Sequence, residues 1–378
     1  MKDAVNGVPD FDLVSIGSGP AGQRAAVQAA KLGKRAAVIE RFRKVGGVCL
    51  WTGTVPSKTF REAVLGSVRS ARRGERPTIQ QLLSRVDDVV RRETEVIESQ
   101  LRRNDVTLIR GEASFHDPHT LVVKTERGSE LVTADRFVIA VGTQPVPPPG
   151  VPTDGELVIT SDDVPRLKRL PKSLVVVGGG VIGVEYASMF AALGVPVTVV
   201  EKREAPLEML DREIVDELVH QMRSQNVTFR LGEAVQRVEI LKGEPSRAAI
   251  RLESGKRIVA DLVLFSAGRK GATAGLELEA AGLKADDRGR LAVDAEFRTT
   301  VPHIYAAGDV IGYPSLAATS SEQGRLAACH AFGASAGPMA QHFPIGIYAI
   351  PEISMVGATE RDLTAAKVPY EHGVARYR

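Results

Sequence analysis

The sequence is poor in cysteine. Its 378 residues include two, Cys49 and Cys329, which cannot form the disulfide framework of a secreted domain. The first residues, MKDAVNGVPDFD, also lack the charged and then apolar order of a signal peptide. We therefore expect a cytoplasmic protein, and we expect no metal site.

Long apolar runs and an excess of one charge are absent too. Glycine interrupts the apolar runs well short of the ~20 residues that cross a bilayer, so no membrane segment is expected. The 49 basic and 46 acidic residues leave a formal net charge of +3. No long basic run is interleaved with aromatic residues, so nucleic acid is not an expected partner.

Glycine, in contrast, recurs in a pattern that occurs twice. Residues 11–22 read FDLVSIGSGPAG, and residues 174–183 read LVVVGGGVIG. Each stretch is a short apolar strand with a GxGxxG turn, followed by a helical pattern and a second strand that ends in glutamate. In both copies that glutamate lies 23 residues after the first glycine. A single GxGxxG is weak evidence, but two with equal spacing predict an α/β chain with two Rossmann-like dinucleotide-binding domains.

Each residue of the pattern has a role at a dinucleotide. The first glycine permits a tight turn, the second lets the backbone approach a pyrophosphate, and the third allows close helix packing. The helix start offers N–H groups to phosphates, and the glutamate suits a ribose diol. The alternative is a glycine turn with a surface glutamate. These residues are Gly17, Gly19, Gly22 and Glu40 in the first copy and Gly178, Gly180, Gly183 and Glu201 in the second.

Two basic residues follow the second glutamate. Glu201 favours the unphosphorylated ribose of NAD, whereas Lys202 and Arg203 can pair with the 2′-phosphate of NADP. The alternative is that both are charges of a solvated loop. If they do bind phosphate, one pocket accepts both NAD(H) and NADP(H).

A third nucleotide signal lies in HIYAAGD, residues 303–309. An apolar strand ends at Gly308, where the chain can approach a ligand, and Asp309 offers acceptors to sugar or ribityl hydroxyls. The helix expected from about Leu316 would point its N-terminal dipole there, which would stabilise negative charge on a flavin ring. Taken alone, a buried strand end with a turn aspartate is the better interpretation.

In this order the motifs resemble the FAD- and pyridine-nucleotide-dependent disulfide oxidoreductase family. The matching stretches are 17–22 with Glu40, 46–49, 56–58, 140–145, 178–183, 267–269 and 306–309. The resemblance implies that FAD is bound by the first unit with Gly308 and Asp309, and that NAD(P) is bound by the second. It also implies further cofactor contacts at Arg41, Gly46, Gly47, Cys49, Thr54, Gly111, Ala113, Gly142, Gly268, Arg269, Leu316 and Ala317.

The resemblance implies a domain order as well. We expect an FAD-binding domain at 1–149 and 273–342, interrupted by an NAD(P)-binding domain at 150–272, with the proline-rich stretch 146–152 at the first boundary. Members of the family continue through a C-terminal domain that forms a homodimer. Residues 343–378 are therefore expected to be the incomplete start of that domain, in a truncated chain.

Two residues are expected to be catalytic. Lys58 and Glu185 match the lysine and glutamate that sit together beside flavin N5 in the family. An ammonium there favours an electron-rich ring, and a carboxylate keeps it charged and oriented. Without the family pattern, an exposed lysine near a helix start and a glutamate in a helix's first turn are the better interpretations.

One position departs from the disulfide members of the family. They carry two cysteines in a C-x4-C motif. Here Thr54, five residues after Cys49, stands where the second cysteine would be, so hydride cannot leave through a dithiol. We expect Cys49 to be a packing residue beside the flavin. Threonine in G-x-C-x-x-x-G-T-V-P-S-K is similar to the soluble, Si-specific pyridine nucleotide transhydrogenases. That resemblance implies that NADPH reduces FAD and that NAD⁺ then collects the hydride in the same pocket.

The sequence leaves three alternatives to this function open. The first is an NAD(P)H oxidase or diaphorase that passes electrons to oxygen or quinones. The second is a flavoprotein like lipoamide dehydrogenase, and the third is a catalytically silent FAD-binding or interaction protein.

Overall fold

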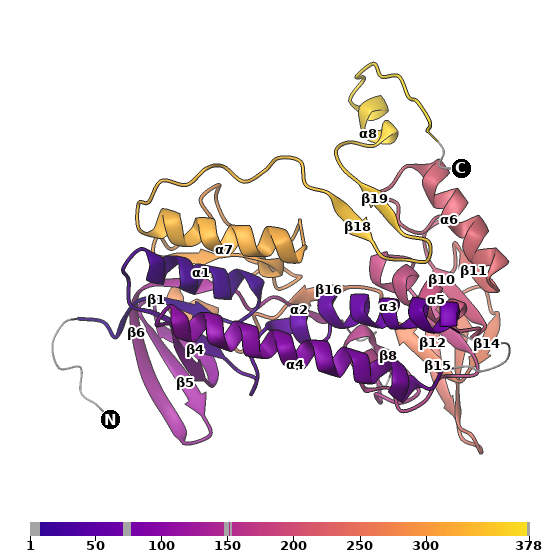
Figure 1. Cartoon of the computed structure of the whole chain (residues 1–378), viewed down its shortest axis with the longest axis horizontal. Helices are drawn as coiled ribbons and strands as arrows, with labels where there is room; N and C mark the ends of the chain where they lie inside the picture. Colours follow the sequence, from indigo (N-terminus) through magenta and orange to yellow (C-terminus); the bar gives the residue numbers. More distant parts are fainter. Residues whose placement is uncertain (1–7, 71–76, 147–150, 152, 376–378) are drawn as a thin grey trace. The chain divides into compact units, whose positions relative to one another are not determined.

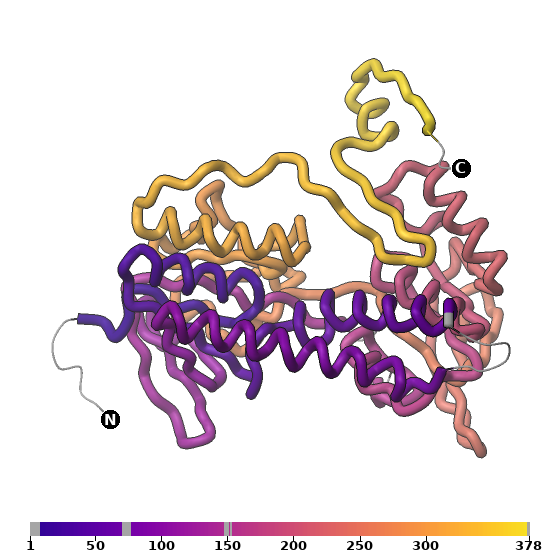
Figure 2. Tube along the Cα trace, viewed as in Figure 1, coloured from indigo at the N-terminus to yellow at the C-terminus, as the bar shows by residue number. Residues whose placement is uncertain are grey.

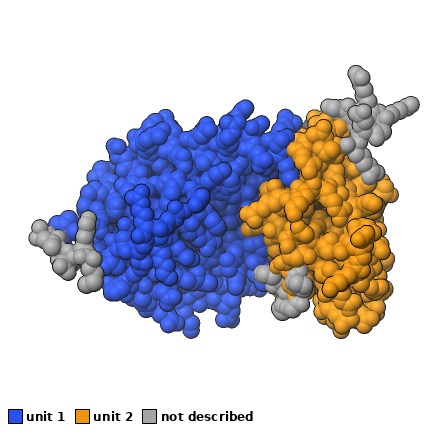
Figure 3. Space-filling view, turned by 90° about the horizontal axis from the view of Figure 1, so that it is seen from below, with its two compact units in different colours: residues 1–59, 83–146, 269–339 blue, residues 60–82, 147–268, 340–378 orange. Residues whose placement is uncertain are grey.

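The computed structural model describes residues 8–70, 77–146, 151 and 153–375, and in it the chain forms two compact units. Unit 1 comprises residues 1–59, 83–146 and 269–339, and unit 2 comprises residues 60–82, 147–268 and 340–378 (Figure 3). Each unit is assembled from segments that lie far apart along the chain (Figure 2). The predicted boundary at 149 and most of the proline-rich stretch around it lie outside the described residues.

Unit 1 is built on a sheet with the strand order β3, β2, β1, β6, β5, β4, in which β17 also pairs with β6. The strands β3, β2, β1, β6 and β17 pair in parallel, whereas β4, β5 and β6 pair antiparallel. Their bounds are β1 (Phe11–Ile16), β2 (Ala36–Glu40), β3 (Thr107–Arg110), β4 (Glu112–Asp117), β5 (Thr120–Thr125), β6 (Gly128–Ile139) and β17 (Ile304–Ala306). A second, two-stranded sheet pairs β7 (Thr143–Pro145) with β16 (Arg269–Gly271).

The helices of unit 1 cover a sheet whose central strands are apolar on both faces. Leu13 and Val38 face one core cluster, and Val14 and Ile39 face another. The helix α1 (Pro20–Lys31) lies beside α7 (Ala317–Ala331) (Figure 1). A Cβ at Gly324 would lie 2.0 Å from the Ala21 carbonyl oxygen, so glycine is what lets these helices pack so closely. The unit also contains α2 (Gly47–Trp51), η2 (Leu278–Ala281) and η3 (Asp309–Ile311).

Two helices carry the chain from one unit into the other. They are α3 (Thr54–Ser70) and α4 (Ile79–Arg103). Unit 2 has a parallel sheet of order β11, β10, β9, β15, β8, an antiparallel sheet of β12 to β14, and a hairpin of β18 and β19. Its strands are β8 (Val158–Thr160), β9 (Leu174–Val177), β10 (Val197–Glu201), β11 (Val227–Leu231), β12 (Val235–Leu241), β13 (Arg247–Leu252), β14 (Arg257–Ala260), β15 (Leu262–Phe265), β18 (Ile345–Ile347) and β19 (Ile353–Met355). Its helices are η1 (Ser161–Arg166), α5 (Val181–Ala192), α6 (Arg212–Ser224) and α8 (Glu360–Ala365).

The predicted fold class is confirmed, because each unit contains a strand, a glycine turn and a helix, and the strand pairs in parallel with its neighbours in the sheet. The strand predicted at 303–309 is shorter than expected. It ends at Ala306, and Asp309 begins a 3₁₀ turn, because Gly308 adopts a φ of +83° that a strand does not continue. In the described part of the chain, no helix combines the length and apolar character that crossing a bilayer requires.

Candidate functional site

The glycine turn of unit 1 is tightly packed at Gly22 and open at Gly19. A Cβ at Gly22 would lie 1.9 Å from the Gly17 carbonyl oxygen, so only glycine lets α1 start this close to β1. A Cβ at Gly19 would meet no protein atom within 4 Å. The space at the N-terminus of α1 is therefore free for a phosphate group, which the helix N–H groups and dipole would stabilise.

Glu40 lies at the end of β2 and is only 4% exposed. One carboxylate oxygen accepts hydrogen bonds from the Ser18 backbone (3.0 Å) and hydroxyl, and the other accepts from the Phe42 N–H at 2.9 Å. Ser18 Oγ in turn accepts from the Gly46 N–H at 2.9 Å. Ser18 thus joins Glu40, the glycine turn and the segment at Gly46, a role that the sequence analysis missed. The only sequence signal is a polar residue between two glycines of the turn.

The segment at Gly46 and Gly47 crosses the glycine turn. Both residues have positive φ, and a Cβ at Gly47 would lie 2.9 Å from the Gly19 Cα. This crossing places α2 and the start of α3 next to the open end of α1. Cys49 lies in α2, and Thr54 is the first residue of α3.

Cys49 is a partly buried free thiol. Burial raises its pKa above the usual range, and the Asp309 carboxylate acts in the same direction. A hydrogen bond with the Thr54 side chain and the charge of Lys58 oppose this rise without cancelling it. The structure therefore brings Cys49, Thr54, Lys58 and Asp309 close together, in surroundings that favour the protonated thiol of Cys49.

Restoring the missing sulfur tests this arrangement. Because Thr54 hydrogen-bonds to the Cys49 thiol, Thr54→Cys should form a disulfide with Cys49 on mild oxidation. A thiol titration should then find one free thiol fewer than in the wild type, and the reduced, FAD-loaded variant should show a thiolate-to-flavin charge-transfer band. Thr59→Cys, five residues after Thr54 in the same helix, is the matched control and should gain a free thiol instead. A charge-transfer band in the wild type would contradict the packing role of Cys49.

Asp309 lies in η3, directly after Gly308, whose N–H donates to the Gln323 side-chain oxygen at 2.8 Å. Burial raises the pKa of Asp309, while the Arg269 charge and a hydrogen bond with Ser320 lower it. Arg269 donates from Nε to Thr143 Oγ1 and from Nη2 to the Thr143 carbonyl, both at 3.0 Å. Within unit 1 the structure thus brings together Thr143, Arg269 and Asp309, one residue from each of three predicted stretches.

The other predicted contacts of unit 1 lie at turns and at the ends of elements. Gly111 donates its N–H to the Glu40 carbonyl at 2.9 Å, next to the buried Ala113 in β4. Leu316 caps α7, and Ala317 is its first residue. Arg41 is exposed, with its guanidinium 4.8 Å from the Phe42 ring centre. Gly142 of unit 1 has positive φ, as does Gly268, which belongs to unit 2.

The glycine turn of unit 2 repeats the geometry of unit 1. A Cβ at Gly183 would lie 2.0 Å from the Gly178 carbonyl oxygen, whereas a Cβ at Gly180 would meet no atom within 4 Å. Glu201, at the end of β10, is 4% exposed and accepts a hydrogen bond from the Gly179 N–H. The same combination of close packing and open space therefore occurs at both predicted nucleotide sites.

Arg203 lies on Glu201 itself. Its guanidinium donates to both carboxylate oxygens at 2.9 Å, and its N–H donates to one of them at 3.0 Å. Burial alone would raise the pKa of Glu201, but hydrogen bonds from Arg203 and from the Gly179 N–H lower it to about 2. Lys202 is exposed. Arg203 is thus the counter-ion of the buried Glu201, which the sequence did not predict.

This pair predicts a pH-dependent contribution to stability. Because the folded pKa of Glu201 is about 2 and its ordinary value is 4.5, the contribution is present above pH 4.5 and is lost as pH falls from there toward 2. Arg203→Ala should lower the free energy of unfolding by about 2 kcal/mol at about pH 7, a figure discounted for the exposed side of the guanidinium, and by much less at about pH 3. Urea unfolding at both pH values measures this, with Lys202→Ala as control. An equal loss at both pH values would contradict the role of the pair.

Glu185 lies in α5 of unit 2 and is 3% exposed. Its Oε1 accepts a hydrogen bond from the Tyr348 N–H at 2.8 Å. Lys58 lies in α3, in the part of that helix that belongs to unit 1. The two predicted catalytic residues thus belong to different units, Lys58 to unit 1 and Glu185 to unit 2. Their pairing stays a prediction.

Comparison with known proteins places this geometry in context. Residues 11–324 match the family model described as "Pyridine nucleotide-disulphide oxidoreductase". A Mycobacterium bovis protein named "Soluble pyridine nucleotide transhydrogenase" is 52% identical over 98% of this chain and 81% of its own length. A Photobacterium profundum protein of the same name is 43% identical over 97% of this chain and 80% of its own length. Among solved structures, the HOCl-induced flavoprotein disulfide reductase RclA from Escherichia coli has a TM-score of 0.84 at 30% identity, over 94% of this chain and 79% of that one.

Proposed function

Since the chain belongs to the pyridine nucleotide-disulphide oxidoreductase family, we infer that it is an FAD-dependent enzyme that transfers hydride between NADPH and NAD⁺. The observation that carries this function is the threonine at position 54. Because Thr54 replaces the second cysteine and Cys49 is a free thiol, electrons on the reduced flavin cannot leave through a pair of cysteines. The nicotinamide pocket then serves as both entrance and exit.

The residues of unit 1 fit FAD. The open space at Gly19 suits the pyrophosphate, the buried Glu40 suits a ribose, and the turn at Gly308 and Asp309 suits the ribityl chain. Bound FAD would supply the hydride chemistry, by accepting a hydride from one nicotinamide and returning it to another. We propose that Lys58 holds a positive charge beside the flavin ring and that Glu185 keeps that charge oriented.

We propose that unit 2 binds both nucleotides in turn. With NAD, the Glu201 carboxylate would accept hydrogen bonds from the ribose hydroxyls. With NADP, Arg203 and the exposed Lys202 would face the 2′-phosphate, and Arg203 would share its donors between that phosphate and Glu201. An ion pair that can be shared in this way suits a pocket that must release one nucleotide before it accepts the other.

The shared ion pair predicts a change in specificity. Replacing both Lys202 and Arg203 by alanine should weaken NADP(H) binding by about 100-fold, because two cationic partners of the phosphate are lost, and NAD(H) binding by no more than about fivefold. Titration of the flavin-loaded enzyme with each nucleotide measures both constants. Equal losses for the two nucleotides would contradict a role of Lys202 and Arg203 at the 2′-phosphate.

Stopped-flow reoxidation tests the function itself. The FAD-loaded chain is reduced with NADPH without oxygen and is then mixed with NAD⁺ or with oxygenated buffer. Transhydrogenation requires NAD⁺ to restore the oxidised flavin spectrum faster than oxygen does. Faster reoxidation by oxygen would favour the oxidase alternative. A bound FAD that NADPH cannot bleach would favour a silent flavin-binding protein.

We further propose that the domains follow the order that the family implies, with FAD bound by 1–149 and 273–342 and NAD(P) by 150–272. The exposed Val356, Val368 and Val374 support the assignment of 343–378 to a surface that pairs two copies in a homodimer. Two free cysteines support a place in the reducing cytoplasm. Sedimentation velocity of the chain tests the dimer.

A further inference from the structure

The segment after β18 is held against α5 by two side chains on one face of that helix. The Tyr348 N–H donates to Glu185 Oε1 at 2.8 Å, and the Ile350 N–H donates to Ser188 Oγ at 3.0 Å. Glu185 and Ser188 are three residues apart, so they lie next to each other on the helix surface. The segment therefore supplies a fixed donor to the Glu185 carboxylate.

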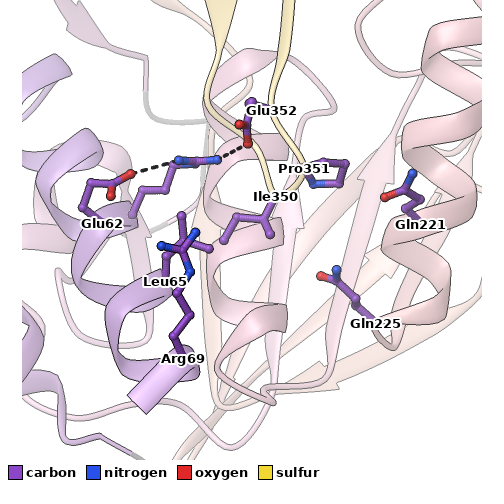
Figure 4. A pocket seen from close by; sticks show the side chains of 9 residues that line it. Glu62, Leu65, Arg69, Gln221, Gln225, Ile350, Pro351 and Glu352 are labelled. Atoms are coloured by element: carbon purple, nitrogen blue, oxygen red, sulfur yellow. Dashed lines mark hydrogen bonds and ion pairs between the residues drawn. The ribbon is translucent and has the colours of Figure 1, made fainter. Parts of the chain in front are cut away.

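The same segment is held by Arg61 in α3. Arg61 Nε donates to the Ala349 carbonyl at 3.2 Å, and Nη2 pairs with Glu352 at 2.5 Å. The Arg61 side chain is 8% exposed, and Nη1 also pairs with Glu62 at 3.0 Å. Figure 4 shows Glu62 and Glu352 linked to this guanidinium by dashed lines. Arg61 therefore binds Ala349, the residue between Tyr348 and Ile350, whose N–H groups donate to side chains of α5.

Aromatic packing fixes the helix that carries Arg61. The rings of Phe60 in α3 and Phe190 in α5 lie 5.9 Å apart, and both side chains are buried. Since Phe60 is the neighbour of Arg61, this packing fixes the backbone from which the Arg61 side chain reaches Ala349 and Glu352. Its fork contacts a carbonyl and a carboxylate at once, which the single ammonium of lysine does less well.

We propose that Arg61 is a positioning residue for hydride transfer, one that orients the Glu185 carboxylate by clamping residues 348–352 against α5. The proposal rests on the proposed function, which makes Glu185 a catalytic residue. Without Arg61, the Ala349 carbonyl and Glu352 lose their buried donors. The Tyr348 amide, one residue away, then no longer has a fixed position on Glu185.

A second arginine provides a matched control. Arg69 lies two helical turns after Arg61 and lines the same cavity of about 410 Å³, together with Gln225 and Ile350 (Figure 4). Its charge acts on Glu352, but among the described residues it forms no hydrogen bond with residues 348–352. Arg69→Met therefore removes an arginine from the same cavity and leaves the clamp in place.

Hydrogen exchange of the chain without FAD or nucleotide tests the clamp directly. In Arg61→Met the Tyr348 and Ile350 amides should exchange about tenfold faster than in the wild type, because their local opening becomes easier. In Arg69→Met they should exchange at the wild-type rate. Unchanged exchange in Arg61→Met, or equal acceleration in both variants, would overturn the proposal. If Arg61→Met does not fold, Arg61→Lys is measured instead, and its amide exchange should be accelerated by a smaller factor.

Flavin reduction by NADPH tests the link to Glu185. At saturating NADPH, Arg61→Met should reduce the FAD about tenfold more slowly, with the half-saturating NADPH concentration little changed, and Arg61→Lys should recover part of the rate. Adding Arg61→Met to Glu185→Gln should cost no further rate, because the residue that Arg61 positions is already lost. Fully additive losses would overturn the proposal. A wild-type rate in Glu185→Gln would instead overturn the proposed catalytic role of Glu185, while the exchange result for Arg61 would still stand.

Discussion

Replacing Gly22 by alanine will strongly destabilise unit 1, whereas replacing Gly19 by alanine will leave it stable but unable to hold FAD tightly. The Cβ at Gly22 would lie 1.9 Å from the Gly17 carbonyl oxygen, so α1 must move away from β1, at a cost of about 4 kcal/mol. Gly19 has a φ of −66° and a ψ of 179°, which alanine adopts freely. Its Cβ meets no protein atom within 4 Å, so the only group it can displace is a bound ligand.

Two measurements separate these outcomes. Urea unfolding of the FAD-free chain should show Gly19→Ala within about 0.5 kcal/mol of the wild type and Gly22→Ala strongly destabilised. FAD titration should show Gly19→Ala weakened by about 100-fold, as expected when hydrogen bonds to a charged pyrophosphate are lost. Gly180→Ala, at the equivalent open position of unit 2, is the control and should keep its FAD affinity. Unchanged FAD binding by Gly19→Ala would show that the pyrophosphate lies elsewhere.

Replacing Lys58 by methionine will slow flavin reduction by NADPH about 100-fold. The proposed function places the Lys58 ammonium beside the flavin ring, where a fixed charge stabilises the electrons that arrive with the hydride. A loss of this size corresponds to about 3 kcal/mol of barrier height, which is the usual effect of removing one such electrostatic contact. Methionine keeps the apolar stem of lysine, so FAD binding should change by less than about threefold.

Rapid mixing of each FAD-loaded variant with excess NADPH measures the reduction rate. Lys58→Arg should recover part of the loss, because it keeps the charge but places it differently. Lys44→Met is the matched control, since Lys44 lies in the same stretch of chain with its ammonium 4.5 Å from the Trp51 ring centre. An equal slowing in Lys44→Met, or a wild-type rate in Lys58→Met, would remove Lys58 from the catalytic site.

Much of the fold was predictable because its signal is local. A strand, a glycine turn, a helix and a second strand occupy about thirty successive residues, and their apolar spacing is set by each element's own geometry. The positions of Gly22 and Gly183 follow from that order, because the helix must start against its strand. The departure at Thr54 was equally predictable, because the identity of one residue shows that the second cysteine is missing.

Other features could not be predicted from the sequence, because they are side-chain contacts between residues that neither helix nor strand periodicity relates. Ser18 was missed since its hydroxyl meets both Glu40 and Gly46 only when β2 and the segment after it have folded onto the turn. Arg203 was expected either to pair with a 2′-phosphate or to be a loop charge, and neither expectation included its ion pair with Glu201, two residues away. Proximity in sequence did not reveal that contact, because the direction of a long side chain depends on the nearest buried charge.

The sequence by itself determined the two nucleotide-binding folds, the positions of their glycines and glutamates, and the absence of a dithiol. Only the tertiary structure decided what holds Glu185 in place. Its amide donor comes from Tyr348, 163 residues away, and Arg61 holds that segment through Glu352, 291 residues away in the chain. The physical reason is that secondary structure follows from neighbours along the chain, whereas the orientation of a buried charge is set by whichever donors packing brings to it.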